Sequence, residues 1–363
     1  MNITTDEFNA MYSDWITPNT VILEILLAVG VFGNTFAFLL YKFCVPYTEE
    51  RFFIPYLAVV DLFVCVWGGS FSLILNFYRA NFPDAVLCKV MYYFTWGSIN
   101  FSALLLLIIA FHRYKRICRP ISPQWSEHKR RIAVGGGGIF SFILTIPILL
   151  LFGEKRGNIV HQGTNVTVVT CNVMSFTRDE SFIYMAFSIL YFIILMTAII
   201  ILYSLIGVTI FRTFQVRASR KIRKLVENNR GHNSIMSEDT NISTVEKSVT
   251  SNIDINGEPE MKRHFPKKKA VVIHVRHNFT GMFAAIIMFW VVSYLPTITL
   301  IIIPAAQASI EFWFHKSAVT INILLFLKRA FMLNHVVNPF IYGYFDVGFR
   351  KEAYKLFCFW RRP

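Results

Sequence analysis

The chain has 363 residues, of which 55% are hydrophobic and only 16% are charged, and its formal net charge is +14. So few charges cannot cover the apolar surface of a soluble protein of this length, so the composition excludes an ordinary soluble domain. The positive charge alone would suit a nucleic-acid-binding protein, but the placement of Lys and Arg argues for membrane orientation and against a nucleic-acid partner.

Seven apolar segments are each long enough to cross a bilayer, which takes about twenty residues of helix. Isolated strands cannot satisfy their backbone in lipid, so each span must be helical. We predict an all-α membrane protein, a seven-transmembrane helix bundle over residues 20–345, after an N-terminal tail at 1–19. The predicted spans are 20–42, 52–75, 86–117, 132–151, 182–211, 271–303 and 318–342.

The loops between the spans differ in basic content. The 1–19 tail has no Lys or Arg, whereas the loops on the opposite side carry most of them, including Lys115, Arg116, Lys129 and Arg130. The side richer in Lys and Arg normally faces the cytoplasm. We therefore expect an extracellular N-terminus, a cytoplasmic C-terminus, and contact between the basic side and anionic lipids of the bilayer.

Two cytoplasmic segments lie outside the predicted spans. The loop at 215–266 is polar and poor in aromatic residues in its middle, so we expect it to be largely disordered. In the segment 346–363, Phe349 and Tyr354 fall at helical spacing with basic residues between them, which predicts a short amphipathic helix on the inner leaflet. Cys358 near its end either carries a palmitoyl chain or remains a free thiol.

Polar and helix-bending residues inside the spans occur in a fixed order along the chain. They are Gly33-Asn34, Asp61 after Leu57-Ala58, Cys88, His112-Arg113-Tyr114, Tyr203, Pro296 and Asn338-Pro339-Phe340-Ile341-Tyr342. This set, across almost the whole chain, resembles the rhodopsin-like (class A) G-protein-coupled receptors, and loosely the neuropeptide receptors among them. The resemblance implies a signal transducer of the plasma membrane and not an enzyme.

In this family, a ligand binds on the extracellular side of the membrane. The cytoplasmic end of the sixth helix then moves outward, and a heterotrimeric G protein docks there. Arrestin and receptor kinases are further partners that the resemblance implies. The activation residues carried over from the family are Arg113, Tyr114, Tyr203, Tyr294, Pro296, Asn338, Pro339 and Tyr342. A disulfide between Cys88 and Cys171 is implied as well, and Asn2 and Asn165 lie in glycosylation sequons on the outer side.

Asp61 is a carboxylate at membrane depth, where a charge is costly and usually functional. In the family such a carboxylate helps to hold an allosteric sodium ion, the one cofactor or metal that we consider. The residues that could converge on Asp61 are Asn34, Ser102, Asn334 and Asn338. The alternative is that Asp61 is protonated or hydrogen-bonded to these amides. His335 stands where the family commonly has Ser, and its imidazole could compete with sodium for the carboxylate.

Several positions depart from the family pattern. His112 precedes Arg113 where an acid is common, and Arg276 stands where the sixth helix often supplies a second acid. Either the resting state is weakly held and basal signalling is measurable, or another group replaces the carboxylates. Tyr294 also stands where Trp is usual.

The ligand can be narrowed by exclusion. Thr95 replaces the acid that amine receptors need, and Met332 replaces the lysine that binds retinal. Lys328 and Arg329 lie in the outer half of the seventh span, where one of them either meets an anionic ligand group or pairs with Glu24. The candidate pocket residues are Tyr92, Thr95, Trp96, Ile99, Thr297 and Lys328.

This pocket is aromatic and mostly neutral, which suits a peptide or a lipid-like molecule. We favour a peptide as the ligand, because the sequence HRYKRICRP, the long outer loop and the missing amine counter-ion loosely resemble the neuropeptide receptors. A receptor for a lipid or a small organic acid is the alternative. A transporter or channel is a more distant alternative, since it would be expected to have discontinuous helices or inverted repeats, and the two halves of this sequence indicate neither.

Overall fold

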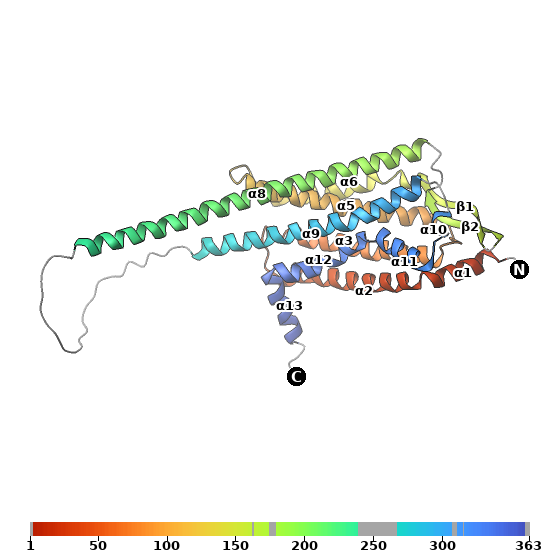
Figure 1. Ribbon diagram of the computed structural model, residues 1–363, viewed down its shortest axis with the longest axis horizontal. Coiled ribbons are helices and arrows are strands. Elements are labelled where there is room, and N and C mark those ends of the chain that lie inside the picture. The colour runs from red at the N-terminus through yellow and green to blue at the C-terminus, as the bar shows by residue number, and fades with distance from the viewer. Residues whose placement is uncertain are drawn as a thin grey trace.

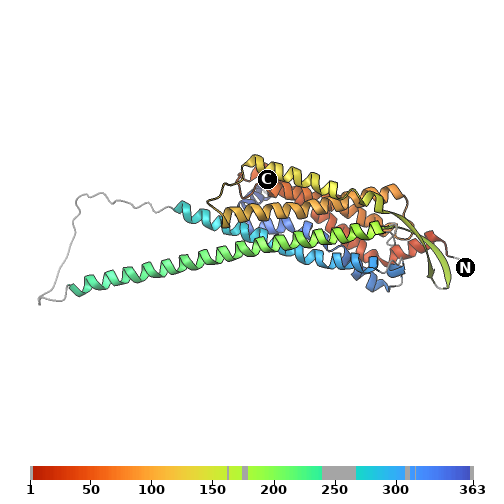
Figure 2. The same cartoon turned by 90° about the horizontal axis from the view of Figure 1, so that it is seen from above.

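The computed structural model describes residues 3–161, 163–173, 179–238, 267–306, 311–314 and 316–359. Long helices run side by side along one axis, and a β-hairpin lies across one end of the bundle (Figures 1 and 2). We call this the hairpin end and the opposite end, where α13 leaves the bundle, the α13 end. Among the described residues, six helices are long and apolar enough to cross a membrane, or seven when one bent pair counts as a single span.

The first half of the chain supplies four of the spans. In chain order its elements are α1 (Thr5–Trp15), α2 (Thr17–Leu39) with the π-helical turn η1 (Leu40–Cys44), α3 (Ile54–Phe63), η2 (Val64–Gly68), α4 (Gly69–Phe77), α5 (Ala85–Cys118), α6 (Glu127–Leu144) and α7 (Ile148–Leu151). Side chains such as Phe32 and Leu150 stay exposed on their outer faces, as expected of surfaces that contact lipid.

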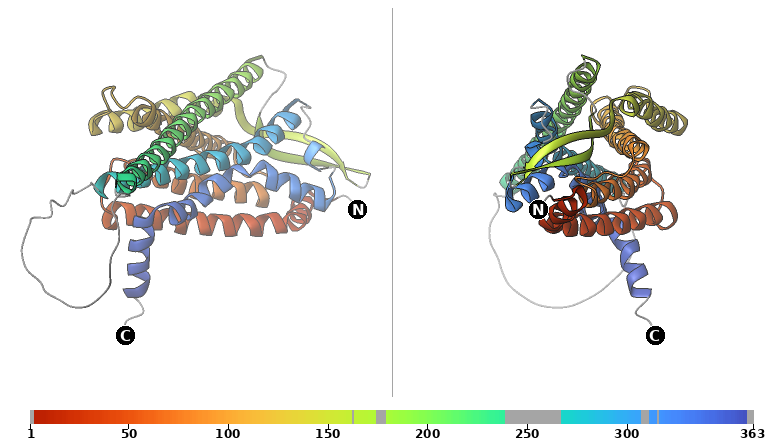
Figure 3. Two further views of the ribbon diagram at one scale, coloured as in Figure 1. Left: turned by 60° about the vertical axis from the view of Figure 1, so that its left-hand side comes forward. Right: turned by 90° about the vertical axis from the view of Figure 1, so that its right-hand side faces the viewer.

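The second half supplies the hairpin and the remaining spans. Its elements are β1 (Phe152–His161), β2 (Thr164–Val173), α8 (Asp179–Glu238), α9 (Lys267–Ala306), α10 (Glu311–Phe314), α11 (Ala318–Lys328), α12 (Phe331–Phe345) and α13 (Val347–Phe359). The two antiparallel strands pair from Phe152 with Val173 to His161 with Thr164. The hairpin crosses the end of the bundle in the right-hand view of Figure 3.

The N-terminal tail predicted at 1–19 contains a helix, because α1 occupies most of it. Thr4 caps this helix, and its side chain and the Glu7 side chain bind each other's backbone N–H groups. Phe8 and Tyr12 are buried against the hairpin and α10. A polar sequence therefore conceals a short helix with two large anchoring side chains.

One further boundary differs from the predictions. The helix α8 continues to Glu238, well into the 215–266 loop that we expected to be largely disordered. Residues such as Arg, Lys and Leu there favour helix, and α8 extends beyond the bundle (Figure 1). Residues 239–266 lie outside the described residues. The predicted amphipathic helix is present as α13, which leaves the bundle at a steep angle to its axis.

The span predicted at 318–342 is present as two helices and not as one. The helices α11 and α12 meet at Arg329 and Ala330 and are bent by 58°. The Arg329 side chain is buried among polar groups of α2 and α4, which gives a physical reason for the break at this residue. A guanidinium at this depth must find hydrogen-bond acceptors, and the backbone turns to deliver it to them.

Candidate functional site

The predicted polar core forms in the middle of the bundle around Asp61 of α3, which is fully buried. Its Oδ1 lies 2.7 Å from Nδ1 of His335, and its Oδ2 accepts a hydrogen bond of 2.6 Å from the Asn338 amide. The other imidazole nitrogen of His335 lies 3.2 Å from the hydroxyl of Tyr294 on α9. A continuous chain of polar contacts therefore joins α3, α12 and α9.

The other predicted core residues are buried but do not bind the carboxylate directly. Asn34 donates to the backbone oxygens of Gly30 and His335, at 2.9 and 2.8 Å. The side-chain polar atoms of Ser102 and Asn334 form no hydrogen bond with any described residue. The residue that completes the carboxylate's surroundings is His335, the departure from the family pattern.

The sodium ion that the resemblance implies does not fit this donor set. A hard cation needs oxygen lone pairs. Here each oxygen of Asp61 already faces a nitrogen of His335 or Asn338 at hydrogen-bond distance. The imidazole takes the side of the carboxylate where the family's serine would leave room for an ion. We therefore predict that sodium has little effect on this protein.

Replacing His335 with serine is expected to create sodium dependence. With the imidazole gone, sodium at several times its Kd should stabilise the variant by about 1 kcal/mol and raise its melting temperature by roughly 2 °C. The measurement is thermal unfolding of the purified chain in sodium chloride against choline chloride. His128→Ser, at an exposed position of α6, is the control. A sodium-specific rise in the wild type that Asp61→Asn abolishes would contradict the prediction.

Arg113 lies near the α13 end of α5 and is almost fully buried. Its Nη2 donates a 3.0 Å hydrogen bond to the backbone oxygen of Glu50. Its guanidinium carbon lies 4.8 Å from the ring centre of Phe283 and 5.8 Å from that of Phe279, both on α9. These faces attract a cation through the ring quadrupole. Aromatic rings on α9 therefore hold Arg113, which favours the replacement of the usual carboxylates by another group.

The other predicted activation residues lie at several depths. The hydroxyls of Tyr203 and Tyr342 are buried and form no hydrogen bond with any described residue. Tyr114 accepts a 3.5 Å bond from Arg119. Tyr294 stacks on Phe192 of α8, while Pro296 and Pro339 both lie within helices, α9 and α12. The side chain of Arg276 lies outside the described residues.

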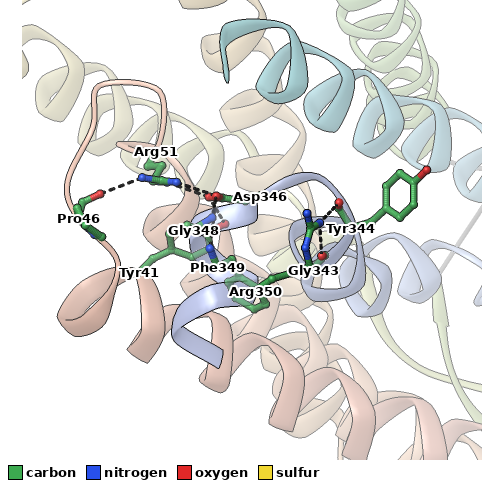
Figure 4. Close-up of polar contacts among 9 residues, drawn as sticks. All are labelled: Tyr41, Pro46, Arg51, Gly343, Tyr344, Asp346, Gly348, Phe349 and Arg350. Atoms are coloured by element: carbon green, nitrogen blue, oxygen red, sulfur yellow. Dashed lines mark hydrogen bonds and ion pairs between the residues drawn. The ribbon is translucent and has the colours of Figure 1, made fainter. Parts of the chain in front are cut away.

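Sequence reasoning missed an ion pair at the α13 end, shown in Figure 4. Nε and Nη2 of Arg51 bind the two oxygens of Asp346, at 2.8 and 2.7 Å, and Tyr41 donates to the same carboxylate at 3.0 Å. The backbone N–H of Gly348 donates to it as well, at 2.8 Å. This clamp joins the loop after η1 to the junction of α12 and α13. The guanidinium carbon of Arg51 also lies 5.3 Å from the ring centre of Phe279, and Arg113 contacts the same ring.

The clamp should persist through mildly acidic pH. Burial alone would raise the pKa of Asp346, but Arg51, Tyr41 and the Gly348 amide outweigh it and bring the pKa below its usual value of 3.8. Because the folded pKa is lowered, the stabilisation is present above the usual value and is lost only as pH falls through the lower folded value. The contribution of the clamp to the melting temperature of the protein should thus not change between pH 7 and pH 5.

Asp346→Asn should destabilise the protein by about 3 kcal/mol at pH 7, since it leaves a half-buried guanidinium without its carboxylate. Thermal unfolding measures the loss. Glu352→Gln removes a carboxylate paired with exposed Lys355 on α13 and should cost under about 0.5 kcal/mol. Equal melting temperatures for the two variants would show that the clamp contributes no more than a surface pair.

At the hairpin end a cleft with a cavity volume of about 40 Å³ opens between the helices and the hairpin. Two predicted pocket residues, Tyr92 and Lys328, line it. Thr95, Ile99 and Thr297 are buried and Trp96 is half-buried, and these four do not line the cleft. The lining residues are Leu75, Tyr78, Arg79, Tyr92, Thr170, Cys171, Asn172, Trp313, Phe314 and Lys328.

Lys328 and Arg329, the two adjacent cations of the seventh span, lie in different surroundings. Lys328 lies over Trp313, with Nζ 4.8 Å from the ring centre. Arg329 is buried, and it donates to the side-chain oxygens of Asn19 and Asn76, the latter at 2.7 Å, and to the backbone oxygen of Ser72 at 3.0 Å. The alternative that one of them pairs with Glu24 is wrong, since Glu24 is exposed on α2 and forms no ion pair with a described residue.

The predicted disulfide between Cys88 and Cys171 is present and ties the start of α5 to β2. Asn165 is exposed on β2, as a glycosylation site requires. Asn2 and the side chain of Cys358 lie outside the described residues, so glycosylation and palmitoylation there stay predictions.

Comparison with known proteins adds an independent finding. Residues 38–342 match the family model of the 7 transmembrane receptor (rhodopsin family). The chain is 25% identical over 345 residues to the thyrotropin-releasing hormone receptor of Gallus gallus, a match that covers 93% of this chain and 78% of that protein.

Other relatives match over shorter stretches. The chain is similar to the neuropeptide S receptor of Mus musculus, at 24% identity over 42% of this chain and 41% of that protein. It is also similar to the cholecystokinin receptor type A of Rattus norvegicus, at 29% identity over 33% of this chain and 28% of that protein. These two matches thus span less than half the length of each relative.

Proposed function

The chain belongs to the rhodopsin family of seven-transmembrane receptors, and from this premise we propose that it binds an extracellular peptide and activates a heterotrimeric G protein. The names of its relatives support a peptide, because each is a receptor for a peptide hormone or neuropeptide. The cleft at the hairpin end supports a binding site. Excess Lys and Arg at the α13 end supports a cytoplasmic location for that end, in the plasma membrane.

The observation that carries the proposal is the position of Arg113 against α9. Phe279 and Phe283 cover its guanidinium in this structure. An outward movement of α9 at the α13 end would carry both rings away and expose a cation to the G protein. Nearer the hairpin end of α9, Tyr294 contacts His335 and Phe192. A ligand that moves this part of α9 therefore also moves the two rings that cover Arg113.

Ligand binding would then work by population shift. A ligand that prefers the arrangement with α9 displaced draws the equilibrium towards it, by no more than its difference in affinity for the two states. The chain carries out no covalent chemistry in this scheme. Arrestin and receptor kinases, implied by the resemblance, would act on the same cytoplasmic surface.

A second-messenger assay tests the proposal in cells that express the full chain, against peptide pools. Arg113→Ala should reduce the response at least tenfold at unchanged surface expression, because the G protein loses its contact. Arg131→Ala, which removes an exposed arginine paired with Glu127 on α6, should respond as the wild type does. A response in Arg113→Ala equal to that of the wild type would count against G-protein coupling through this residue.

A further inference from the structure

Two cations share one aromatic ring in the cleft at the hairpin end. Arg79, in the turn after α4, lies with its guanidinium carbon 5.1 Å from the ring centre of Trp313. Lys328, the last residue of α11, places Nζ 4.8 Å from the same centre. Both line the cleft, together with Trp313 itself. Segments that are far apart in the sequence therefore bring two positive charges to one small site.

No carboxylate neutralises this pair within the described part of the chain. None of the ion pairs formed by its residues includes Arg79 or Lys328. None of the lining residues that the structure describes is acidic. Arg329 adds a third charge directly behind Lys328, and the partners that bind it, Asn19, Asn76 and Ser72, offer neutral oxygens only. The cleft thus has a strong positive field with low-dielectric walls, which attracts anions.

The rest of the wall suits an oriented ligand. Tyr78, Tyr92 and Phe314 supply aromatic surface, whereas Thr170 and Asn172 supply polar groups at the edge of β2. The disulfide at Cys171 fixes this strand to α5. The cavity volume is about 40 Å³, which is enough for a small group such as one carboxylate but not for a whole peptide.

We propose that this cleft is a carboxylate-binding subsite, in which Arg79 and Lys328 together hold one carboxylate of the peptide. The proposal rests on the proposed function in one respect, that the ligand is a peptide from outside. A carboxylate fits because arginine donates two parallel bonds to it and lysine adds a point charge. The carboxylate is supplied either by a free C-terminus or by an acidic side chain, and both have the same chemistry.

Thermal unfolding of the purified full-length chain in detergent tests this without any G protein. The probes are three pools of N-acetylated tripeptides. One has a free C-terminal carboxylate and no Asp or Glu, one has a C-terminal amide and one Asp or Glu, and one has a C-terminal amide and no acid. Oleate serves as a fourth probe. At least one acidic pool should raise the melting temperature of the wild type, and the neutral pool should not.

The variants assign the effect to the two cations. Lys328→Gln and Arg79→Gln remove one charge each and should weaken binding of the acidic pool at least tenfold, which a titration of the melting temperature shows. Lys328→Arg keeps the charge and should retain binding, which separates loss of charge from misfolding. Arg156→Gln makes the same change of charge on exposed β1, outside the cleft, and should bind as the wild type does.

The acidic pool that binds identifies the source of the carboxylate. The proposal is overturned if the neutral pool stabilises the chain equally, if neither acidic pool does, if only oleate does, or if both glutamine variants bind normally. Failure of the proposed function looks different, because acidic pools would then stabilise the chain while the second-messenger assay stayed silent.

Discussion

Phe283→Leu is expected to raise ligand-independent signalling about tenfold. The Phe283 ring is fully buried and lies closest to the Arg113 guanidinium, at 4.8 Å. A buried cation–π contact contributes roughly 1–2 kcal/mol, and each 1.4 kcal/mol changes an equilibrium tenfold. Leucine keeps most of the volume and apolar character, so packing changes less than the contact does. The resting arrangement loses the contact, whereas an arrangement with α9 displaced does not have it.

The measurement is second-messenger level in the absence of ligand, normalised to surface expression. Phe279→Leu should act in the same direction, since that ring contacts both Arg51 and Arg113. Phe52→Leu is the matched control, because it removes a cation–ring contact of similar distance, 4.5 Å from the Arg130 guanidinium, that involves no ring of α9. If Phe52→Leu and Phe283→Leu raise basal signalling equally, the rings of α9 are not what keeps the resting state in place.

Asn76→Ala is expected to destabilise the protein more than Arg329→Met does. The first change removes an acceptor 2.7 Å from a buried guanidinium and leaves the charge in place, at a cost of about 3 kcal/mol. The second removes the charge together with its demand for partners and replaces it with an apolar side chain of similar length, which is often close to neutral. The order of the two effects thus reports whether the buried charge itself is costly.

Thermal unfolding gives both values, and the double variant completes a cycle that isolates the coupling between the two residues. Asn81→Ala removes an asparagine whose amide bonds exposed Asp6 and should change stability by less than about 0.5 kcal/mol. A larger loss for Arg329→Met than for Asn76→Ala would mean that the guanidinium stabilises the fold beyond its cost of burial.

The helical spans could be predicted from the sequence because each depends on a local run of apolar residues. The break at Arg329 could not, since it depends on Asn19 and Asn76, which are 310 and 253 residues away. The same holds for Arg51 and Asp346, which are 295 residues apart. Hydropathy reports where a helix can lie in a membrane, but not which distant acceptor a buried cation will bind.

The candidate sites were predictable to different degrees. The family motifs led to Asp61 and Arg113, and the two departures at His335 and His112 indicated where their surroundings would differ. The residues that contact Arg113 and His335 could be identified only from the fold, because Phe283 and Tyr294 are ordinary aromatic residues in an apolar span. Arg79 and Trp313 were missed for a similar reason, as both lie in short connecting segments whose positions no periodicity determines.

The short helix α1 has a kinetic consequence. Its Tyr12 hydroxyl donates to the Trp313 backbone oxygen at 2.8 Å, and its Phe8 ring lies 5.7 Å from that of Phe314. Trp313 and Phe314 line the cleft, so α1 holds one wall of it in place. If this wall must open before a ligand enters or leaves, opening slows both steps. Tyr12→Phe should then shorten the residence time of a bound peptide while changing its equilibrium affinity far less.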